Sequence, residues 1–160
     1  MTNSSRRRSN SGYSTIELAL IFVVAVILAG FVASKYQAIR QTRRDDTRKN
    51  DITQLQLGIQ SYWAQTGNFP SLAQMDSAGF RANSLNKLDP SAAQDPRWNS
   101  GNKYCATKGK LGFEDSLEPH TGCFGYVPSP SGCDNKDTAC SGYSLSAKLE
   151  AGGYYSQSSS

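Results

Sequence analysis

The chain has 160 residues, of which 38% are hydrophobic, and it carries four cysteines, one histidine and a formal charge of +4 at pH 7. Three of the positive charges are Arg6, Arg7 and Arg8, so the rest of the chain carries only +1 and its charge does not indicate a nucleic-acid-binding protein. Beyond an N-terminal segment, the length leaves room for one modest globular domain.

An apolar run extends from Leu18 to Ala33 without a charged or hydrogen-bonding side chain. Counted from Tyr13 as a helix, it is about 31 Å long, close to the roughly 30 Å thickness of a bilayer's hydrocarbon core. Residues 13–35 are therefore predicted to span a membrane. Basic residues flank the run on both sides, so the positive-inside rule does not fix its orientation. A secretory signal peptide cut near Ser34 is the alternative, and the length of the run disfavours it.

Glu17 is the one acidic residue in this predicted span. A carboxylate within a transmembrane helix costs roughly 3 kcal/mol, so such a residue is a candidate for function. The simpler interpretation is that Glu17 lies at the helix end and reaches the lipid headgroups.

A polar leader with three arginines ends at Gly12, an aromatic residue follows at Tyr13, and Glu17 comes four residues later. This arrangement resembles the prepilin-type cleavage and methylation segment of type IV pilins and related pseudopilins. The resemblance implies that a prepilin peptidase removes the leader, residues 1–12, by cutting between Gly12 and Tyr13. It also implies that Glu17 pairs, in the filament core, with the new amine at Tyr13 of a neighbouring subunit. Two such charges about 4 Å apart attract by about 4 kcal/mol at an effective dielectric near 20.

No proline or turn signal follows the apolar run before Gly67, which predicts one helix from Tyr13 to Gln65, about 80 Å long. Its second half, residues 36–66, is predicted to be amphipathic, with Gly67 as the stop. The apolar positions on its one face are Tyr36, Ile39, Ile52, Leu55, Ile59, Tyr62 and Trp63.

A charged stretch, residues 40–51, lies in the middle of this predicted helix. We expect it to be a solvated helical segment with spaced ion pairs of Arg44 and Arg48 with Asp45 and Asp51. Salt bridges between subunits, or binding to anionic lipid at the membrane exit, are the functional alternatives.

Residues 67–155 are predicted to form a small head, which makes the fold class α+β: a long helix packed on a small antiparallel sheet with disulfides. The Gly67–Pro70 phrase resembles the start of pilin and major pseudopilin heads. An irregular connection is expected around Pro90 and Pro96, and residues 156–160 are expected to be a loose Ser-rich tail. The predicted strands are Lys103–Thr107, Gly122–Val127 and Tyr143–Leu149, with a turn at Gly152–Gly153.

The four cysteines include no C-x-x-C pair, which favours disulfides formed in an oxidising compartment. Cys105 and Cys123 fall in the first two predicted strands, while Cys133 and Cys140 bracket an eight-residue segment. We therefore expect the pairs Cys105–Cys123 and Cys133–Cys140, although four cysteines allow three connectivities. The second pair resembles the disulfide-bounded region of many type IV pilins. Zinc is the alternative, and the intervals of seventeen, nine and six residues argue against it.

The sequence shows no catalytic constellation, so no enzyme is predicted: its one histidine, His120, lies alone in a loop, and no nucleophile or phosphate-binding motif occurs. No cofactor is expected, although two acidic clusters raise calcium as an alternative to solvated surface charge. They are Glu114, Asp115 and Glu118, and Asp134, Asn135 and Asp137.

A basic patch with aromatic residues is a weak indication of DNA binding, and solvated loop charges explain it more simply. The patch consists of Lys103, Lys108, Lys110, Trp98 and Tyr104.

The resemblance implies a structural subunit that lies in the inner, cytoplasmic membrane as a precursor and outside the cell once assembled into a pilus. Its implied partners are further copies of itself in a helical homopolymer, the prepilin peptidase and the inner-membrane assembly platform, with a host surface or DNA as ligands of the fibre. One alternative is a pseudopilin of a type II secretion system, which works as a periplasmic piston. Another is a membrane-anchored enzyme or binding protein.

Overall fold

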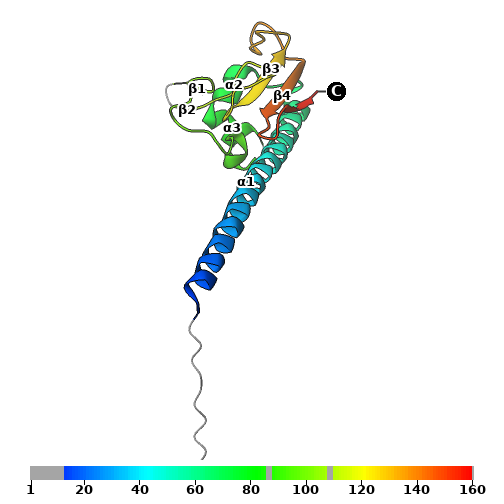
Figure 1. Cartoon of the computed structure of the whole chain (residues 1–160). Helices are drawn as coiled ribbons and strands as arrows, with labels where there is room; N and C mark the ends of the chain where they lie inside the picture. Colours follow the sequence, from blue (N-terminus) through cyan, green and yellow to red (C-terminus); the bar gives the residue numbers. More distant parts are fainter. Residues whose placement is uncertain (1–12, 86–87, 108–109, 160) are drawn as a thin grey trace, which may run out of the picture. The chain divides into compact units, whose positions relative to one another are not determined.

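The structure is a computed structural model that describes residues 13–85, 88–107 and 110–159. It divides into two compact units, one ending at Ile39 and the other beginning at Arg40. Helix α1, Thr15–Thr66, contributes to both units, and the other elements all belong to the second unit, which we call the head (Figure 1). The predicted α+β class is confirmed, because a long N-terminal helix is combined with a small antiparallel sheet and two disulfides.

Helix α1 begins and ends within two residues of the predicted bounds. It ends where the sequence expects, because Gly67 adopts a left-handed φ of 77° that a residue with a Cβ rarely takes. The N–H of Gly67 donates to the carbonyl of Trp63 at 2.7 Å and so closes the last turn.

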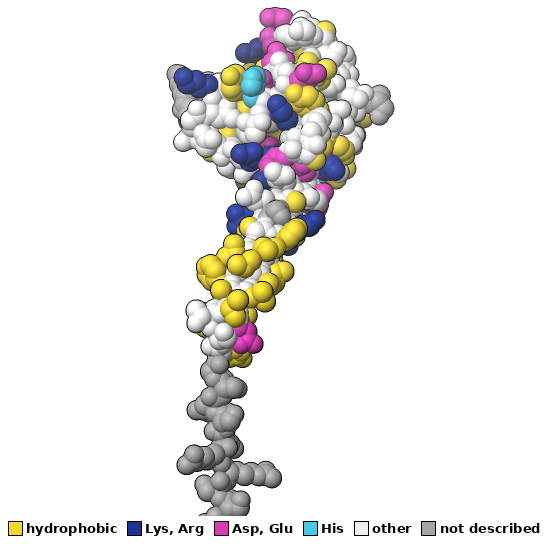
Figure 2. Space-filling view, viewed as in Figure 1, with side chains coloured by type: hydrophobic (Ala, Val, Ile, Leu, Met, Phe, Trp, Pro, Cys, Tyr) yellow, Lys and Arg dark blue, Asp and Glu magenta, His cyan; other side chains and the backbone are white. Residues whose placement is uncertain are grey.

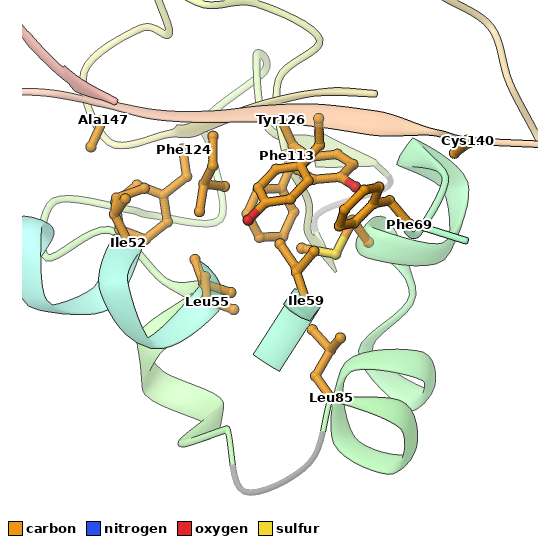
Figure 3. Packing of buried hydrophobic residues seen from close by; sticks show 14 of the residues in the cluster. Ile52, Leu55, Ile59, Phe69, Leu85, Phe113, Phe124, Tyr126, Cys140 and Ala147 are labelled. Atoms are coloured by element: carbon orange, nitrogen blue, oxygen red, sulfur yellow. The ribbon is translucent and has the colours of Figure 1, made fainter. Parts of the chain in front are cut away.

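The head's core lies between α1 and the main sheet. On the helix side, Ile52, Leu55 and Ile59 are fully buried at the three- and four-residue spacing of one helix face. Figure 3 shows these side chains pointing toward aromatic residues of the sheet. The sheet contributes Phe124, Tyr126, Tyr143, Leu145 and Ala147.

The main sheet is antiparallel and has the order β3-β4-β5, with Tyr126 opposite Leu145 in the register. A second, two-stranded sheet pairs β1 with β2. The strands are β1 Ala106–Thr107, β2 Lys110–Leu111, β3 Phe124–Ser129, β4 Gly142–Lys148 and β5 Tyr154–Ser158.

The C-terminal residues differ from the prediction of a loose tail. Ser156 to Ser158 belong to β5, where Ser156 pairs with Ser146 and Ser158 with Ser144. Residues 156–158 are ordered because their backbone pairs with the edge of β4, whose donors and acceptors would otherwise lack partners. A Ser-rich composition hid this strand, since serine has no strong preference for strands.

The predicted strand Lys103–Thr107 is wrong in its first half, because only Ala106–Thr107 form a strand. The side chain of Asn102 accepts a hydrogen bond from the N–H of Tyr104 at 3.0 Å. This local hydrogen bond competes with the pairing of strands, and it keeps the residues before Ala106 in a loop.

Two short helices follow the end of α1, and one 3-10 turn lies in the connection that the sequence predicts to be irregular around Pro90 and Pro96. The first helix begins with a capping box: Ser71 Oγ accepts from the N–H of Gln74, and Gln74 Oε1 accepts from the N–H of Ser71. This Ser-x-x-Gln signature at Ser71 and Gln74 is a signal in the sequence from which the helix could have been predicted. The elements are α2 Leu72–Asp76, α3 Ala78–Ser84 and η1 Pro90–Ala93.

Candidate functional site

The first unit is an apolar helix whose large side chains are all exposed, and Figure 2 shows hydrophobic side chains covering the face of this helix that is in view. Five consecutive residues, 20–24, each expose about half or more of their surface, so the exposure does not follow one face. The twelve large apolar residues concerned are Ile16, Leu18, Leu20, Ile21, Phe22, Val23, Val24, Val26, Ile27, Leu28, Phe31 and Val32. Because these side chains are already partly covered, at 48–77% exposure, moving them out of water is worth roughly 10 to 20 kcal/mol, scaled from about 1.5–3 kcal/mol for each fully buried side chain.

A helix that is apolar all round needs an apolar environment on all sides, which a bilayer or a bundle of similar helices provides. By its length and composition, this part of α1 can span a membrane.

Glu17 stands in the first turn of this apolar helix. Its Oε2 accepts one long hydrogen bond, at 3.4 Å, from the N–H of Ser14. A carboxylate is favoured at this position because the helix dipole is positive at its N-terminus. Tyr13 precedes the helix and is 74% exposed, whereas Gly12, the other predicted processing residue, lies outside the described residues. The carboxylate of Glu17 therefore keeps most of its capacity to accept hydrogen bonds from a partner.

The charged stretch 40–51 is the solvated segment that the sequence predicts only in part, because most of its side chains are exposed and three are buried. Asp45, Arg48 and Asp51 are buried in the head, with Arg48 fully inaccessible. Positions 45 and 48 continue the same three- and four-residue spacing as Ile52 and Leu55, so the face that buries the apolar residues buries these charges too. That spacing is the signal in the sequence that would have revealed them.

Arg48 is the centre of a buried ion network. Its Nε and Nη2 donate to the two carboxylate oxygens of Asp95 at 2.7 and 3.1 Å, the bidentate geometry that suits a guanidinium. Its Nη1 donates to Asp45 at 2.7 Å and to Glu150 at 3.2 Å. Burial lowers the pKa of Arg48, but the hydrogen bonds and charge of Asp95 and its other acidic partners outweigh burial and raise it. Arg48 is thus a permanent cation.

The network joins α1 to the turn between β4 and β5. Arg44 donates to both oxygens of Glu150 at 2.5 and 2.6 Å, and this pairing, with help from Arg48, lowers the pKa of Glu150 to about 2. Asp45 accepts from the N–H groups of Glu150 and Ala151 at 2.8 and 3.0 Å. The expected pair of Arg48 with Asp45 along the helix is present, and the other ion pairs of the network join α1 to Asp95 and Glu150 of the same head.

Asp51 is buried on the same helix face, close to other acids. Burial raises the pKa of Asp51 to about 7, and the charges of Asp95 and Asp89 add to the effect. Among residues 13–85, 88–107 and 110–159, Asp51 forms no ion pair, and the charges that act on it there are those of Asp95 and Asp89.

Both expected disulfides are present, Cys105–Cys123 and Cys133–Cys140. The loop between Cys133 and Cys140 is also tied to the α1–α2 connection. Its Asn135 has a φ of 62°, and the Asn135 amide donates to the carbonyl of Phe69 at 2.7 Å. The disulfide-bounded loop is therefore fixed to the end of the long helix.

In both acidic clusters considered for calcium, carboxylate oxygens accept hydrogen bonds from other groups of the chain. Asp134 Oδ1 accepts from three successive backbone N–H groups of its own loop, and Glu114 accepts from the backbone and the ring of His120. In residues 13–85, 88–107 and 110–159, no three His, Cys, Asp or Glu side chains gather closely enough to hold a metal ion.

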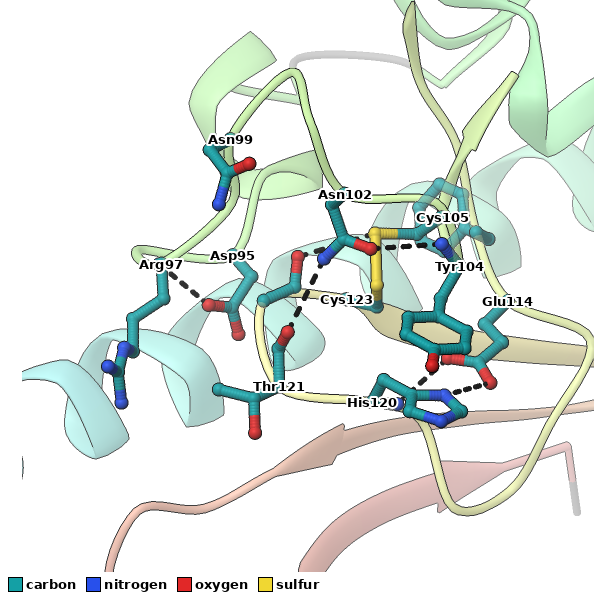
Figure 4. The surroundings of a disulfide bond; sticks show 12 residues. Asp95, Arg97, Asn99, Asn102, Tyr104, Cys105, Glu114, His120, Thr121 and Cys123 are labelled. Carbon is teal, nitrogen blue, oxygen red and sulfur yellow. Dashed lines mark hydrogen bonds and ion pairs between the residues drawn. A yellow bond between two sulfur atoms is a disulfide. The ribbon is translucent and has the colours of Figure 1, made fainter. Parts of the chain in front are cut away.

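The predicted basic patch is divided in the structure. Lys103 and Tyr104 line a recess beside His120, whereas the indole N–H of Trp98 is buried without a partner in the described chain. Lys108 lies outside the described residues. The recess is thus built by Tyr104 and His120 (Figure 4), two residues that the sequence analysis did not connect.

No protein-family model, no curated protein and no solved structure matches this chain. What the chain does must therefore be argued from its own residues.

Proposed function

We propose that this chain is a structural subunit of an extracellular type IV pilus-like filament, which polymerises through its apolar N-terminal helix after cleavage between Gly12 and Tyr13. The observation that carries the proposal is an apolar helix exposed on every side, with one carboxylate in its first turn. The precursor lies in the inner membrane, where a prepilin peptidase and an assembly platform act on it.

Glu17 has a role if the chain polymerises, but it has none if the helix only anchors the chain in a membrane. In the filament, neighbouring helices replace lipid around the apolar side chains, so their burial is kept while the subunit leaves the membrane. The amine created at Tyr13 then becomes a cationic partner for Glu17 of the adjacent subunit. At about 4 kcal/mol, this pair offsets the cost of burying the carboxylate and selects one axial register between subunits.

The head suits a subunit that must survive pulling. The ion network of Arg48 and its acidic partners joins α1 to the β4–β5 turn. The Cys133–Cys140 disulfide closes the loop after β3, which lies beside the C-terminal end of α1. These links oppose separation of the long helix from the sheet, which is the deformation that tension along a fibre would cause.

The test replaces Glu17 by Gln and by Ala in cells that carry the peptidase and the assembly platform, with Thr15→Ala as the matched control in the same helical turn. Filaments sheared from the cell surface and the membrane fraction are both probed for the subunit. We expect Glu17→Gln and Glu17→Ala to accumulate in the membrane without sheared filaments, while the control assembles normally.

Filaments at wild-type level from Glu17→Ala would contradict the proposal and favour an anchor. Short fibres confined to the periplasm, with loss of protein export in the variants, would instead assign the chain to a type II secretion pseudopilus.

A further inference from the structure

The head carries a recess of about 610 Å³ that the proposed filament role does not use. Figure 2 shows the histidine of the chain on the surface of the head, with basic side chains around it. A recess of this volume is large enough for one or two small rings. The side chains that matter for its chemistry are Asn102, Lys103, Tyr104, His120 and Lys148.

The wall of the recess includes two stacked rings. The centroids of Tyr104 and His120 are 3.4 Å apart and their planes differ by 5°. Tyr104 is 59% exposed and the side chain of His120 is 50% exposed, although each ring has one face covered by the other. The pair therefore offers a flat, partly apolar platform to a ligand.

The orientation of His120 is fixed by Glu114 (Figure 4). Its Nδ1 lies 2.7 Å from Glu114 Oε1, and its backbone N–H donates to Glu114 Oε2 at 2.8 Å. Because a carboxylate accepts hydrogen bonds, Nδ1 carries the hydrogen and Nε2 is the nitrogen left for a ligand hydroxyl.

The two segments that bear the rings are also linked to each other. The Cys105–Cys123 disulfide joins them directly beside Tyr104 (Figure 4). The amide of Asn102 donates to the carbonyl of Thr121 at 3.4 Å and accepts from the N–H of Tyr104 at 3.0 Å. A platform held in this way loses little conformational freedom when a ligand binds.

The charge at the recess favours a ligand with a single negative group. Lys103 and Lys148 both line it, and the nearby Glu114 is already engaged by His120. A polyanion is less suitable, because it needs many phosphate contacts and acids outnumber bases from Asn50 onward by ten to eight. Single-stranded nucleic acid also uses several successive stacking platforms, and this recess presents one ring pair.

We propose that this recess binds an acidic saccharide, a sugar ring that carries one carboxylate. The C–H face of the sugar packs on the Tyr104–His120 platform, its carboxylate is held by Lys103 and Lys148, and its hydroxyls bond to His120 Nε2. The inference does not depend on polymerisation, since every group in it belongs to the head.

The experiment titrates the full chain in detergent micelles with D-glucuronate and follows binding by saturation-transfer NMR. D-glucose is the matched probe, because it lacks only the carboxylate. We expect glucuronate to bind at least fivefold more tightly than glucose, Tyr104→Ala to lower its affinity at least tenfold, and Lys148→Gln to lower it at least fivefold. Lys136→Gln, an exposed lysine elsewhere on the head, is the control and should bind as the wild type does.

Near-UV circular dichroism of each variant shows whether the head is folded, and Lys148→Gln decides the question if Tyr104→Ala fails to fold. Equal affinity for glucuronate and glucose, or no effect of these substitutions in folded protein, would overturn the proposal. Tighter binding of oligothymidylate, lost in the same variants, would overturn it in favour of nucleic acid.

Discussion

Replacing Arg48 by Met should destabilise the head by about 3 to 5 kcal/mol, the usual cost of removing one partner from a buried ion pair. The loss of stability is not three times as large although Arg48 contacts three acids, because two of these acids keep other partners. Glu150 keeps Arg44, and Asp45 keeps two backbone N–H donors. The uncompensated charge is chiefly that of Asp95, whose side chain is 1% exposed and which, within the part of the chain that the structure describes, retains only the N–H of Arg97 at 2.7 Å.

The assay is urea unfolding of the full chain in detergent micelles, followed by tryptophan fluorescence. Lys49→Met is the matched control, because Lys49 is exposed on the same helix and should change stability by less than about 0.5 kcal/mol. The double variant Arg48→Met with Asp95→Asn should recover at least half of the loss, since removing both charges leaves no buried ion. A loss below about 1 kcal/mol for Arg48→Met alone would refute the reasoning.

Two further predictions concern the stability of the head. Because the pKa of Asp51 is raised from 3.8 to about 7, the folded head holds this proton more tightly than the unfolded chain, and stability falls as pH rises from about 4 to 7. Asp51→Asn should remove this loss, so that the free energy of unfolding rises by up to about 4 kcal/mol at pH 8 and is unchanged near pH 4. Urea midpoints measured across that pH range test this prediction. A variant whose stability depends on pH as the wild type's does would contradict it. Cys133→Ser with Cys140→Ser should cost about 2 to 3 kcal/mol, since the bond closes an eight-residue loop, and stability equal to the wild type would contradict this.

The features that the sequence predicts well depend on local patterns. The long helix follows from an uninterrupted run without proline before Gly67, and the buried face of α1 follows from the spacing of Ile52, Leu55 and Ile59. The expected disulfide pairing is also present, with Cys133 and Cys140 closing a short loop and Cys105 joined to Cys123, although the sequence alone allows three connectivities.

The features that the sequence does not predict depend on contacts between residues that lie far apart along the chain. Arg48 lies 47 positions before Asp95 and 102 before Glu150, so its charge looks solvated until the fold brings those acids to it. The Tyr104–His120 stack has the same origin, because the disulfide between neighbouring positions brings two loops together. The helical spacing of Arg48 marks it as buried, but no periodicity in the sequence encodes its acidic partners or the Tyr104–His120 stack.

The most direct test of the central claim is mass spectrometry of filaments sheared from the cell surface. The proposed function predicts that this chain is present in the fibre and that its N-terminal peptide begins at Tyr13, immediately after Gly12. Absence of the chain from any fibre, or a mature chain that begins at another residue, would contradict it.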